Sequence, residues 1–166
     1  MSFRRAAIIH MTANLPETIS KLDGPLVKQF SVFLPNKVGA LVEVVRLLNE
    51  HNIHVLAISV QDSADTAIVR IVVTDPEHVK GLFIEHDIPF SICELCVVEL
   101  REGPTQLGPM LASLLAAEVN IFGSYALLTH PRGRTALAIH VEDNECACSV
   151  LSSHGFTILS QTDISR

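Results

Sequence analysis

The sequence has no long apolar run. A helix that crosses a bilayer needs about 18 to 20 consecutive apolar residues, and no stretch of this chain approaches that length. The apolar residues 6–9 follow Arg4 and Arg5, as in an export signal, but His10 ends them after four positions. We therefore expect no membrane partner, no export and a cytoplasmic location.

Basic charge is also scarce. The chain carries 12 Lys and Arg residues against 18 Asp and Glu residues, which gives a formal net charge of −6. Proteins that bind nucleic acid or anionic lipid concentrate basic side chains that neutralise phosphates. We therefore expect neither partner.

Cysteine is sparse, with four in 166 residues, and without an export signal we expect reduced thiols. Cys93 and Cys96 have the spacing of a redox or metal pair, but residues three apart on a strand face opposite sides. Cys146 and Cys148 lie two positions apart on a predicted helix, about 200° around it, as small packing residues do. The sequence therefore predicts no metal site and no cofactor.

Recognisable catalytic motifs are missing as well. Ser, His and Asp residues are frequent, but none lies in a nucleophile elbow or in a phosphate-binding loop. We therefore expect that the protein is not an enzyme.

What the sequence does contain is the same segment twice. Four apolar residues recur 66 positions later, and a second set of four recurs 68 positions later. The first set is Leu41, Val44, Val45 and Leu48, matched by Leu107, Met110, Leu111 and Leu114; the second is Val79, Leu82, Phe83 and His86, matched by Ala147, Val150, Leu151 and His154. The two extra residues fall in residues 130–134, where Pro131 and Gly133 indicate a turn. Because a repeat of about 70 residues exceeds solenoid periods of about 20 to 50, it predicts two similar small domains in tandem.

Hydrophobic periodicity predicts the order strand, helix, strand, strand, helix, strand in each copy. In the first copy we expect strands at 30–34, 53–60, 68–73 and 89–94, a helix from 41 to a stop at Asn52, and a helix from Asp75 and Pro76 to about 86. This order is the α+β, ferredoxin-like arrangement, an antiparallel four-stranded sheet with both helices on one face. The predicted domains are an N-terminal extension at 1–24, where Pro16 is a candidate helix start, a first domain at 25–94 and a second at 95–166.

The junction between the copies predicts how they are joined. Residues 91–96 contain no flexible linker, so we expect the two domains to be held in a fixed relation. Helices cover only one face of each predicted sheet, and a domain this small buries a modest fraction of its surface. We therefore expect a second copy of the chain to cover the other face, in a homodimer.

The loop before the first helix, residues 34–41, is the most informative place for function. The N–H groups of Gly39 to Leu41 lie at the positive end of the predicted helix, which suits a carboxylate. Gly39 lets the backbone approach a ligand without a Cβ in the way, and Asn36 offers both a donor and an acceptor. The alternative is that Asn36 and Gly39 only shape a tight turn.

Residues 33–41, followed by a helix and by Asn52-Ile53-His54-Val55, resemble the ACT domain, whose signature is Asn-x-Pro-Gly-x-Leu before Gly-hydrophobic-Asn-Ile. The resemblance covers residues 25–166 and is closest to small bacterial proteins made almost entirely of two ACT domains. It implies a non-catalytic regulatory protein that binds an amino acid or a similar small ligand, typically at a dimer interface, and signals to a metabolic enzyme. The apolar residues Leu34 and Val38 favour a branched-chain or other apolar amino acid.

The resemblance implies a set of ligand-binding residues, in which Val38 replaces the family's usual Pro and His54 replaces its usual Asn. The set is Asn36, Lys37, Val38, Gly39, Ala40, Leu41, His54 and Asn120. The charge of a histidine at position 54 would depend on pH. The alternative for His54 is a partly exposed residue at a helix-to-strand corner.

The second copy departs further from the signature. Glu102 stands where Asn is expected and would repel a carboxylate, Thr105 stands where Gly is expected, and Pro109 removes an N–H near the helix start. Pro104 and Asn120 do match. We therefore predict that the first copy carries the working loop, while the second is degraded or supplies the opposing wall across an interface.

Two alternatives remain. The first is a regulatory subunit resembling the small subunit of acetolactate synthase, but that subunit has one ACT domain before a different C-terminal region, whereas this chain repeats the domain. The second is a small enzyme or a metal-binding ferredoxin-like protein. Such metal proteins carry their cysteine pair in the first strand-to-helix loop, and residues 34–41 contain no cysteine.

Overall fold

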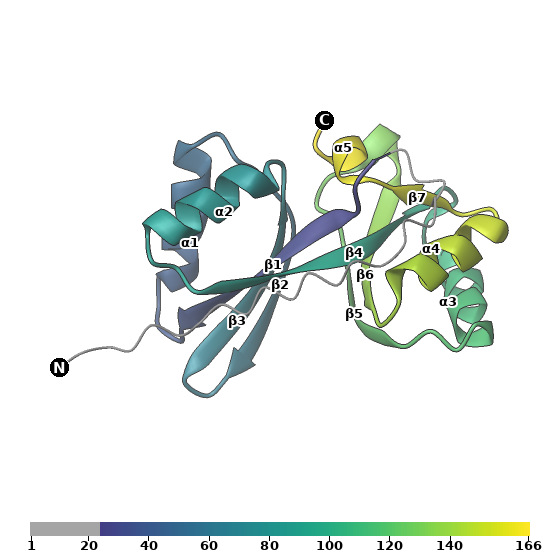
Figure 1. Cartoon of the computed structure of the whole chain (residues 1–166), viewed down its shortest axis with the longest axis horizontal. Helices are drawn as coiled ribbons and strands as arrows, with labels where there is room; N and C mark the ends of the chain where they lie inside the picture. The colour runs from purple at the N-terminus through teal and green to yellow at the C-terminus, as the bar shows by residue number, and fades with distance from the viewer. Residues whose placement is uncertain (1–23) are drawn as a thin grey trace, which may run out of the picture.

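The structure is a computed structural model that describes residues 24–166 (Figure 1). The predicted extension, apart from Gly24, and the candidate helix start at Pro16 lie outside the described residues. The first half contains β1 (Val27–Pro35), α1 (Ala40–Glu50), β2 (Val55–Ser63), β3 (Thr66–Val73), α2 (Pro76–Glu85) and β4 (Phe90–Leu100). The second half contains the short 3₁₀ helix η1 (Gly103–Gln106), α3 (Leu107–Ala116), β5 (Ile121–Ala126), a second short 3₁₀ segment η2 (Pro131–Gly133), β6 (Thr135–Val141), α4 (Asn144–Ser153), β7 (Thr157–Leu159) and α5 (Gln161–Ile164). The α+β, ferredoxin-like order predicted from the sequence is confirmed in both halves.

Local chemistry sets the helix ends. Asp75 precedes α2, and its side chain accepts a hydrogen bond from the N–H of His78 at 3.0 Å, as an N-cap does. Asn52 follows α1 with φ 56°, in the left-handed conformation that closes helices. One boundary was wrong: β2 extends to Ser63, and the turn that was expected at 61–65 is confined to Ala64 and Asp65. None of the helices within residues 24–166 is long and apolar enough to cross a membrane.

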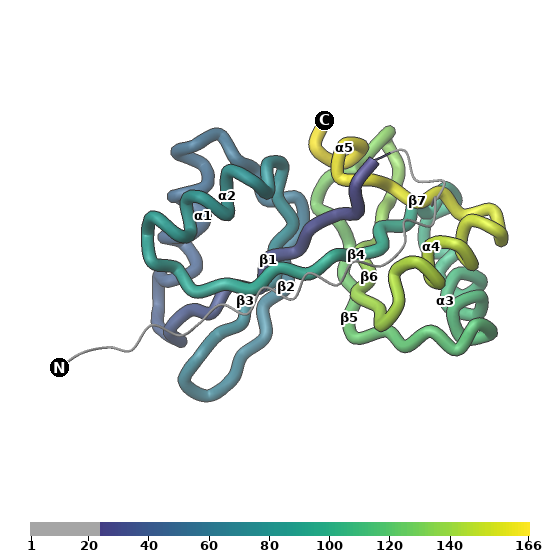
Figure 2. Tube along the Cα trace, in the orientation of Figure 1, coloured from purple at the N-terminus to yellow at the C-terminus, as the bar shows by residue number. Residues whose placement is uncertain are grey.

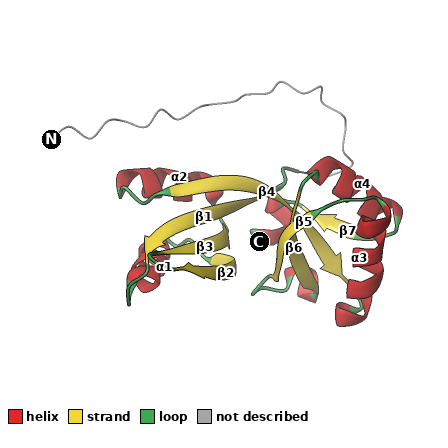
Figure 3. Cartoon of the chain, turned by 90° about the horizontal axis from the view of Figure 1, so that it is seen from below, coloured by secondary structure: helices red, strands yellow, loops and turns green. Residues whose placement is uncertain are grey.

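A single curled antiparallel sheet joins the two halves, in the order β2-β3-β1-β4-β6-β5, with β7 beside β4. The strand β4 belongs to both halves, because residues 90–95 pair with β1 and residues 96–100 pair with β6. Figure 3 shows β4 crossing from the first half to the second. The predicted boundary at residues 94 and 95 therefore falls inside a continuous strand, close to where the partner of β4 changes.

Three apolar clusters form the core. One lies between α1, α2 and the sheet of the first half, where Phe30 packs edge-on against Phe83 with ring centroids 5.7 Å apart. Another lies under α3 and α4 and includes Met110 and Leu151. The third, the middle cluster, combines residues of both halves, namely Val27, Leu56, Ala57, Val72, Leu95, Val97, Leu127, Ala136, Ala138, Leu159 and Ile164.

The middle cluster corrects one step of the sequence argument. We expected a second copy of the chain to cover the helix-free face of the sheet, but the sheet curls and the other half of the same chain already covers the end of that face at Val27, Val72 and Leu95. Phe33 and Ser91, farther along the same face, stay exposed. Polar contacts reinforce this packing: the N–H of Leu128 donates to the carbonyl of Leu56 at 2.7 Å, and the hydroxyl of Tyr125 donates to buried Gln29 at 2.6 Å. Burial of each large side chain contributes about 1.5 to 3 kcal/mol, so the halves hold a fixed relation, as predicted.

The C-terminal helix α5 adds a further connection between the halves. It lies beside the start of β1 (Figure 2), where the N–H of Gln161 donates to the carbonyl of Pro25 at 2.9 Å. The side chain of Gln161 accepts from the N–H of Lys28 at 3.1 Å and donates to the carbonyl of Val73 at 2.9 Å. This short helix is therefore bonded to β1 and β3 of the first half.

Candidate functional site

The candidate site is the loop between β1 and α1, residues 36–39. Gly39 immediately precedes α1 with φ 93°, a conformation that glycine adopts readily and that is costly for residues with a Cβ. A Cβ built at Gly39 would meet no atom within 4 Å. The glycine is therefore required by the backbone turn, and the space beside it is open to a ligand.

No side chain of residues 24–166 caps the first turn of α1. The N–H of Ala40 donates to the carbonyl of Lys37 at 3.3 Å, and that of Glu43 donates to the carbonyl of Gly39 at 3.0 Å. The first N–H groups of a helix lie at the positive end of its dipole and bind an anion readily. This end of α1 can therefore bind a carboxylate.

Asn36 fastens the loop to the β2–β3 hairpin. Its Nδ2 donates to Oδ1 of Asp62 at 2.8 Å and to the carbonyl of Ala64 at 3.4 Å, and its backbone N–H donates to the carbonyl of Asp65 at 3.3 Å. We expected Asn36 to offer both a donor and an acceptor to a ligand. Because the donor is already engaged, the oxygen Oδ1 is the atom that Asn36 can present. Asp62 was missed from the sequence, since nothing there indicates that the hairpin folds back on the loop.

The other predicted loop residues divide into exposed and buried ones. Lys37 and Val38 are exposed, and Leu41 is half-buried against the first core cluster, where it also lines a shallow groove along α1. Ala40 and Leu34 are buried in that cluster. The apolar surface at the loop therefore comes from Val38 and Leu41, and the expected lining by Leu34 was wrong because its side chain points into the core.

His54 and Asn120 occupy equivalent corners of the two halves. The N–H of His54 donates to Oγ1 of Thr74 at 3.1 Å, and the N–H of Thr74 donates to the carbonyl of His54 at 3.1 Å. Asn120 makes the matching pair with Glu142, whose N–H donates to the Asn120 carbonyl at 3.1 Å, and its side chain adds a hydrogen bond to Oε2 of Glu142 at 2.7 Å. Both side chains are exposed.

A single chain does not bring His54 to the loop. Pro35, at the loop end of β1, pairs with Thr66 at the start of β3, whereas His54 contacts Thr74 just beyond the end of β3. Eight residues of strand separate these points, which corresponds to about 26 Å. Asn120 lies in the second half, at the start of β5. The predicted ligand-binding residues therefore lie at three separate places in one chain, and residues 36–41 form the largest group.

The corresponding loop of the second half has a different geometry. Residues 103–106 form the 3₁₀ helix η1, which leads directly into α3. Oγ1 of Thr105 donates to the carbonyl of Glu102 at 3.0 Å, and the side chain of Gln106 accepts from the N–H of Glu102 at 3.2 Å. The positive φ, 66°, is at Gly103 instead of the position that matches Gly39. Two of its polar side chains are therefore engaged within the loop, although neither η1 nor α3 is capped by a side chain of the described residues.

The cysteines lie as the strand geometry predicts. Cys93 packs against the middle cluster and Cys96 lies in the core under α3 and α4, on opposite faces of β4. Burial raises the pKa of the Cys93 thiol. Sγ of Cys96 lies 3.4 Å from Sγ of buried Cys148, a contact that the sequence did not predict. No group of three potential metal ligands occurs within residues 24–166.

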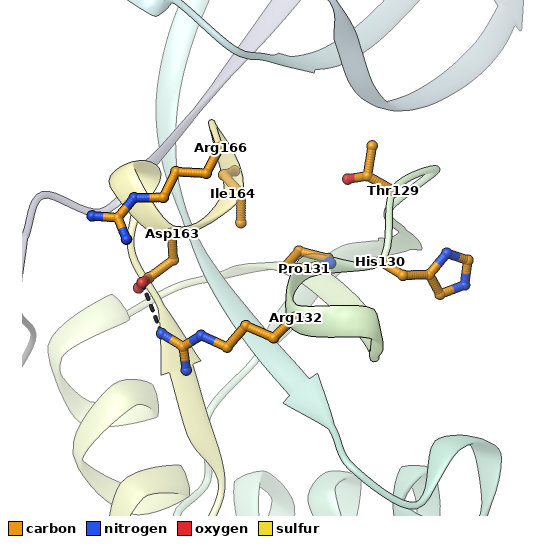
Figure 4. Close-up of a pocket in the computed structure, with 7 residues that line it drawn as sticks. All are labelled: Thr129, His130, Pro131, Arg132, Asp163, Ile164 and Arg166. Atoms are coloured by element: carbon orange, nitrogen blue, oxygen red, sulfur yellow. Dashed lines mark hydrogen bonds and ion pairs between the residues drawn. The ribbon is translucent and has the colours of Figure 1, made fainter.

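A second polar feature was also missed from the sequence. Glu99 on β4 is 1% exposed and is approached by three arginines of the second half. One of them, Arg132, lines a cavity between η2 and α5 (Figure 4). The available signal was a lone acidic residue within the apolar run of residues 96–100, because a charge buried among apolar residues needs partners.

Comparison with known proteins gives the family. Residues 26–166 match the family described as ACT domain pair. A solved structure, protein BT0572 from Bacteroides thetaiotaomicron, is similar over 85% of this chain and 96% of its own, with 26% identity and a TM-score of 0.77. The regulatory subunit of aspartate kinase from Thermus thermophilus, in a ligand-free form, shares the fold over 81% of this chain and 95% of its own, with 15% identity and a TM-score of 0.56. No curated protein matches the sequence significantly.

Proposed function

The chain belongs to the family of ACT domain pairs, and from this premise we propose that it is a non-catalytic regulatory protein of amino-acid metabolism that binds an amino acid at the β1–α1 loop. One observation carries the proposal: α1 begins without a side-chain cap behind a left-handed Gly39, with open space beside that glycine. A carboxylate is the group of an amino acid that such a helix end attracts. The similarity in fold to an aspartate kinase regulatory subunit supports a regulatory role for this chain.

In the proposed complex, the ligand carboxylate accepts hydrogen bonds from the N–H groups of Leu41 and Val42 in the first turn of α1, since that of Ala40 donates to the carbonyl of Lys37. The ligand ammonium donates to Oδ1 of Asn36, since Nδ2 of that side chain is held by Asp62. The ligand side chain lies against Val38 and Leu41, which supply apolar surface at the loop. These contacts favour a branched-chain or other apolar amino acid.

We also propose a homodimer as the working form. The middle cluster covers part of the sheet within one chain, so the case for a dimer does not rest on covering the sheet. It rests on the separation of His54 from the loop by about 26 Å. If both contact the same ligand, they must come from two chains, and a ligand held between protomers stabilises the arrangement that binds it better. A cytoplasmic metabolic enzyme would respond to that arrangement of the dimer.

The test uses two variants in which an exposed apolar side chain becomes acidic. Val38→Glu places a negative charge beside the proposed carboxylate site, and Ile84→Glu makes the same change on α2, where Ile84 is also exposed. We expect at least one of the twenty amino acids to raise the melting temperature of the wild-type protein and of Ile84→Glu, but not of Val38→Glu, because binding to the native state stabilises it. The proposal fails if no amino acid stabilises the folded wild type at millimolar concentration, or if the stabilisation survives in Val38→Glu.

A further inference from the structure

The buried carboxylate of Glu99 is only half satisfied. Its Oε1 accepts from Nη1 of Arg134 at 2.9 Å and from Nε of Arg101 at 3.2 Å. Its Oε2 has no hydrogen-bond partner within the described residues, and Nη1 of Arg132 lies 4.0 Å away. Three guanidinium groups therefore surround one buried carboxylate, which leaves an excess of positive charge at this end of β4.

Arg132 is held in a strained backbone conformation. It lies in the β5–β6 hairpin, where the second repeat has its two extra residues, and has φ 55° and ψ 25°. Left-handed conformations are uncommon for residues other than glycine, and they persist where the surrounding structure imposes them, often at ligand sites. The strain brings the Arg132 side chain to Asp163 of α5, with Nη2 donating to Oδ1 at 2.8 Å. Among the described residues, this is the only hydrogen bond made by the five guanidinium N–H groups of Arg132.

A cavity of about 180 Å³ lies between the hairpin and α5 (Figure 4). Each water molecule occupies about 30 Å³ in the liquid, so the space suits one small organic or inorganic ion. Its walls are formed by Thr129, His130, Pro131, Arg132, Asp163, Ile164 and Arg166. In Figure 4, Arg132 and Arg166 extend to the side where Asp163 lies, whereas the imidazole of His130 points away.

The one acidic wall residue is already neutralised. Oδ1 of Asp163 accepts from Arg132, and Oδ2 accepts from the N–H and the hydroxyl of Ser160, both at 2.9 Å. Although desolvation opposes it, the hydrogen bonds from Ser160 and the Arg132 guanidinium lower the pKa of Asp163. The carboxylate stays ionised and paired at neutral pH. The donors of Arg132 and Arg166 that have no partner within residues 24–166 are therefore left for a ligand of opposite charge.

We propose that this cavity binds a small oxyanion, a carboxylate or a phosphate, through the guanidinium groups of Arg132 and Arg166. Planar guanidinium donors match both kinds of anion with paired hydrogen bonds. The site is separate from the amino-acid site proposed at the β1–α1 loop and does not depend on it. Because α5 is bonded to β1 and β3, an anion that joins the hairpin to α5 also strengthens the contact between the two halves.

The test is a titration of the ¹⁵N-labelled full chain with sodium phosphate and, in a second series, sodium succinate, at constant ionic strength set with sodium chloride. We expect saturable shifts of the backbone amides at residues 129–134 and 163–166, with the anion that saturates at lower concentration identifying the preferred chemistry. Arg132→Gln should weaken this binding about tenfold or more, the effect of losing one charge-assisted pair. Arg46→Gln, at an exposed position on α1, is the matched control and should bind as the wild type does.

Arg132→Gln also removes the hydrogen bond to Asp163 and could therefore disturb the fold. A second variant separates loss of binding from misfolding. Arg166→Gln alters an exposed residue and should weaken binding several-fold in a protein whose spectrum is otherwise native. Linear, non-saturating shifts with both anions would overturn the proposal, as would saturable shifts that Arg166→Gln leaves unchanged. Shifts confined to residues 37–41 would also overturn it, because they would assign the anion to the other loop.

Discussion

The two halves of the chain share one fold and differ in their loops. Both repeats keep the apolar stripes of their helices, and both build an antiparallel sheet under a helix pair. In the first half, the strand-to-helix loop turns at left-handed Gly39, and α1, like α3, has no side-chain cap among the described residues. In the second half, Thr105 and Gln106 close the same loop with their own hydrogen bonds. Apolar periodicity is therefore enough to preserve the fold, while the two loops differ in backbone conformation and in a few polar contacts.

The hairpins also differ, and here the longer loop belongs to the second half. The β2–β3 hairpin of the first half turns tightly at Ala64 and Asp65 and is used to hold Asn36. The β5–β6 hairpin of the second half is longer, contains η2 and carries Arg132 to Glu99 and Asp163. The distinctive polar groups of the two halves therefore lie in different loops.

The largest expected effect comes from opening the contact between the halves. Leu95 is fully buried in the middle cluster, and Leu95→Ala should lower the free energy of unfolding by about 3 kcal/mol, through lost burial and a residual cavity. Leu115→Ala, at a position that is 77% exposed on α3, should change it by less than about 0.5 kcal/mol. Chemical denaturation measures both. Equal effects of the two substitutions would mean that the halves do not stabilise one another.

A smaller effect is expected at the open loop. Gly39→Ala forces a Cβ into a residue with φ 93° and should cost about 1 kcal/mol. Gly81→Ala, in an exposed turn of α2 with open space around it, should instead stabilise by about 0.5 to 1 kcal/mol. Thermal unfolding compares the two variants directly. If Gly39→Ala were as stabilising as Gly81→Ala, the loop conformation would be wrong.

The smallest effect concerns the hairpin of the second half at low pH. The folded-state pKa of Asp163 is lowered below its ordinary value of 3.8, so its ion pair contributes stability above that pH and loses it as the pH falls through the folded-state pKa. The difference in melting temperature between the wild type and Asp163→Asn should therefore be largest near neutral pH and shrink below about pH 4. A difference that is independent of pH would show that the carboxylate charge of Asp163 does not matter.

The sequence predicted most of the fold because the apolar repeat fixes both the element order and the faces of the helices. It did not predict what covers the helix-free faces of the sheet. The residues of β4 are apolar on both sides, as Cys96 and Val97 illustrate, and this pattern is the same whether the cover is another chain or the other half of this one. The curl of the sheet, which decides between them, depends on contacts between residues far apart in sequence, such as Leu56 and Leu128.

The candidate site was predicted in its backbone but not in its side chains. A turn into the helix at Gly39 was expected and is present, but its left-handed conformation was not predicted. The engagement of Asn36 by Asp62 could not be foreseen, since it depends on where the β2–β3 hairpin ends. The distance of His54 from the loop follows from strand lengths, which sequence patterns give only to within a few residues.

The central claim is that the first loop binds an amino acid and the second does not. An NMR titration of the ¹⁵N-labelled chain with each of the twenty amino acids tests it most directly, because the amides of residues 37–41 and of 103–107 report the two loops separately. The account predicts saturable shifts at residues 37–41 with at least one amino acid and unchanged amides at 103–107. Saturable shifts at residues 103–107, or at neither loop with any amino acid, would contradict it.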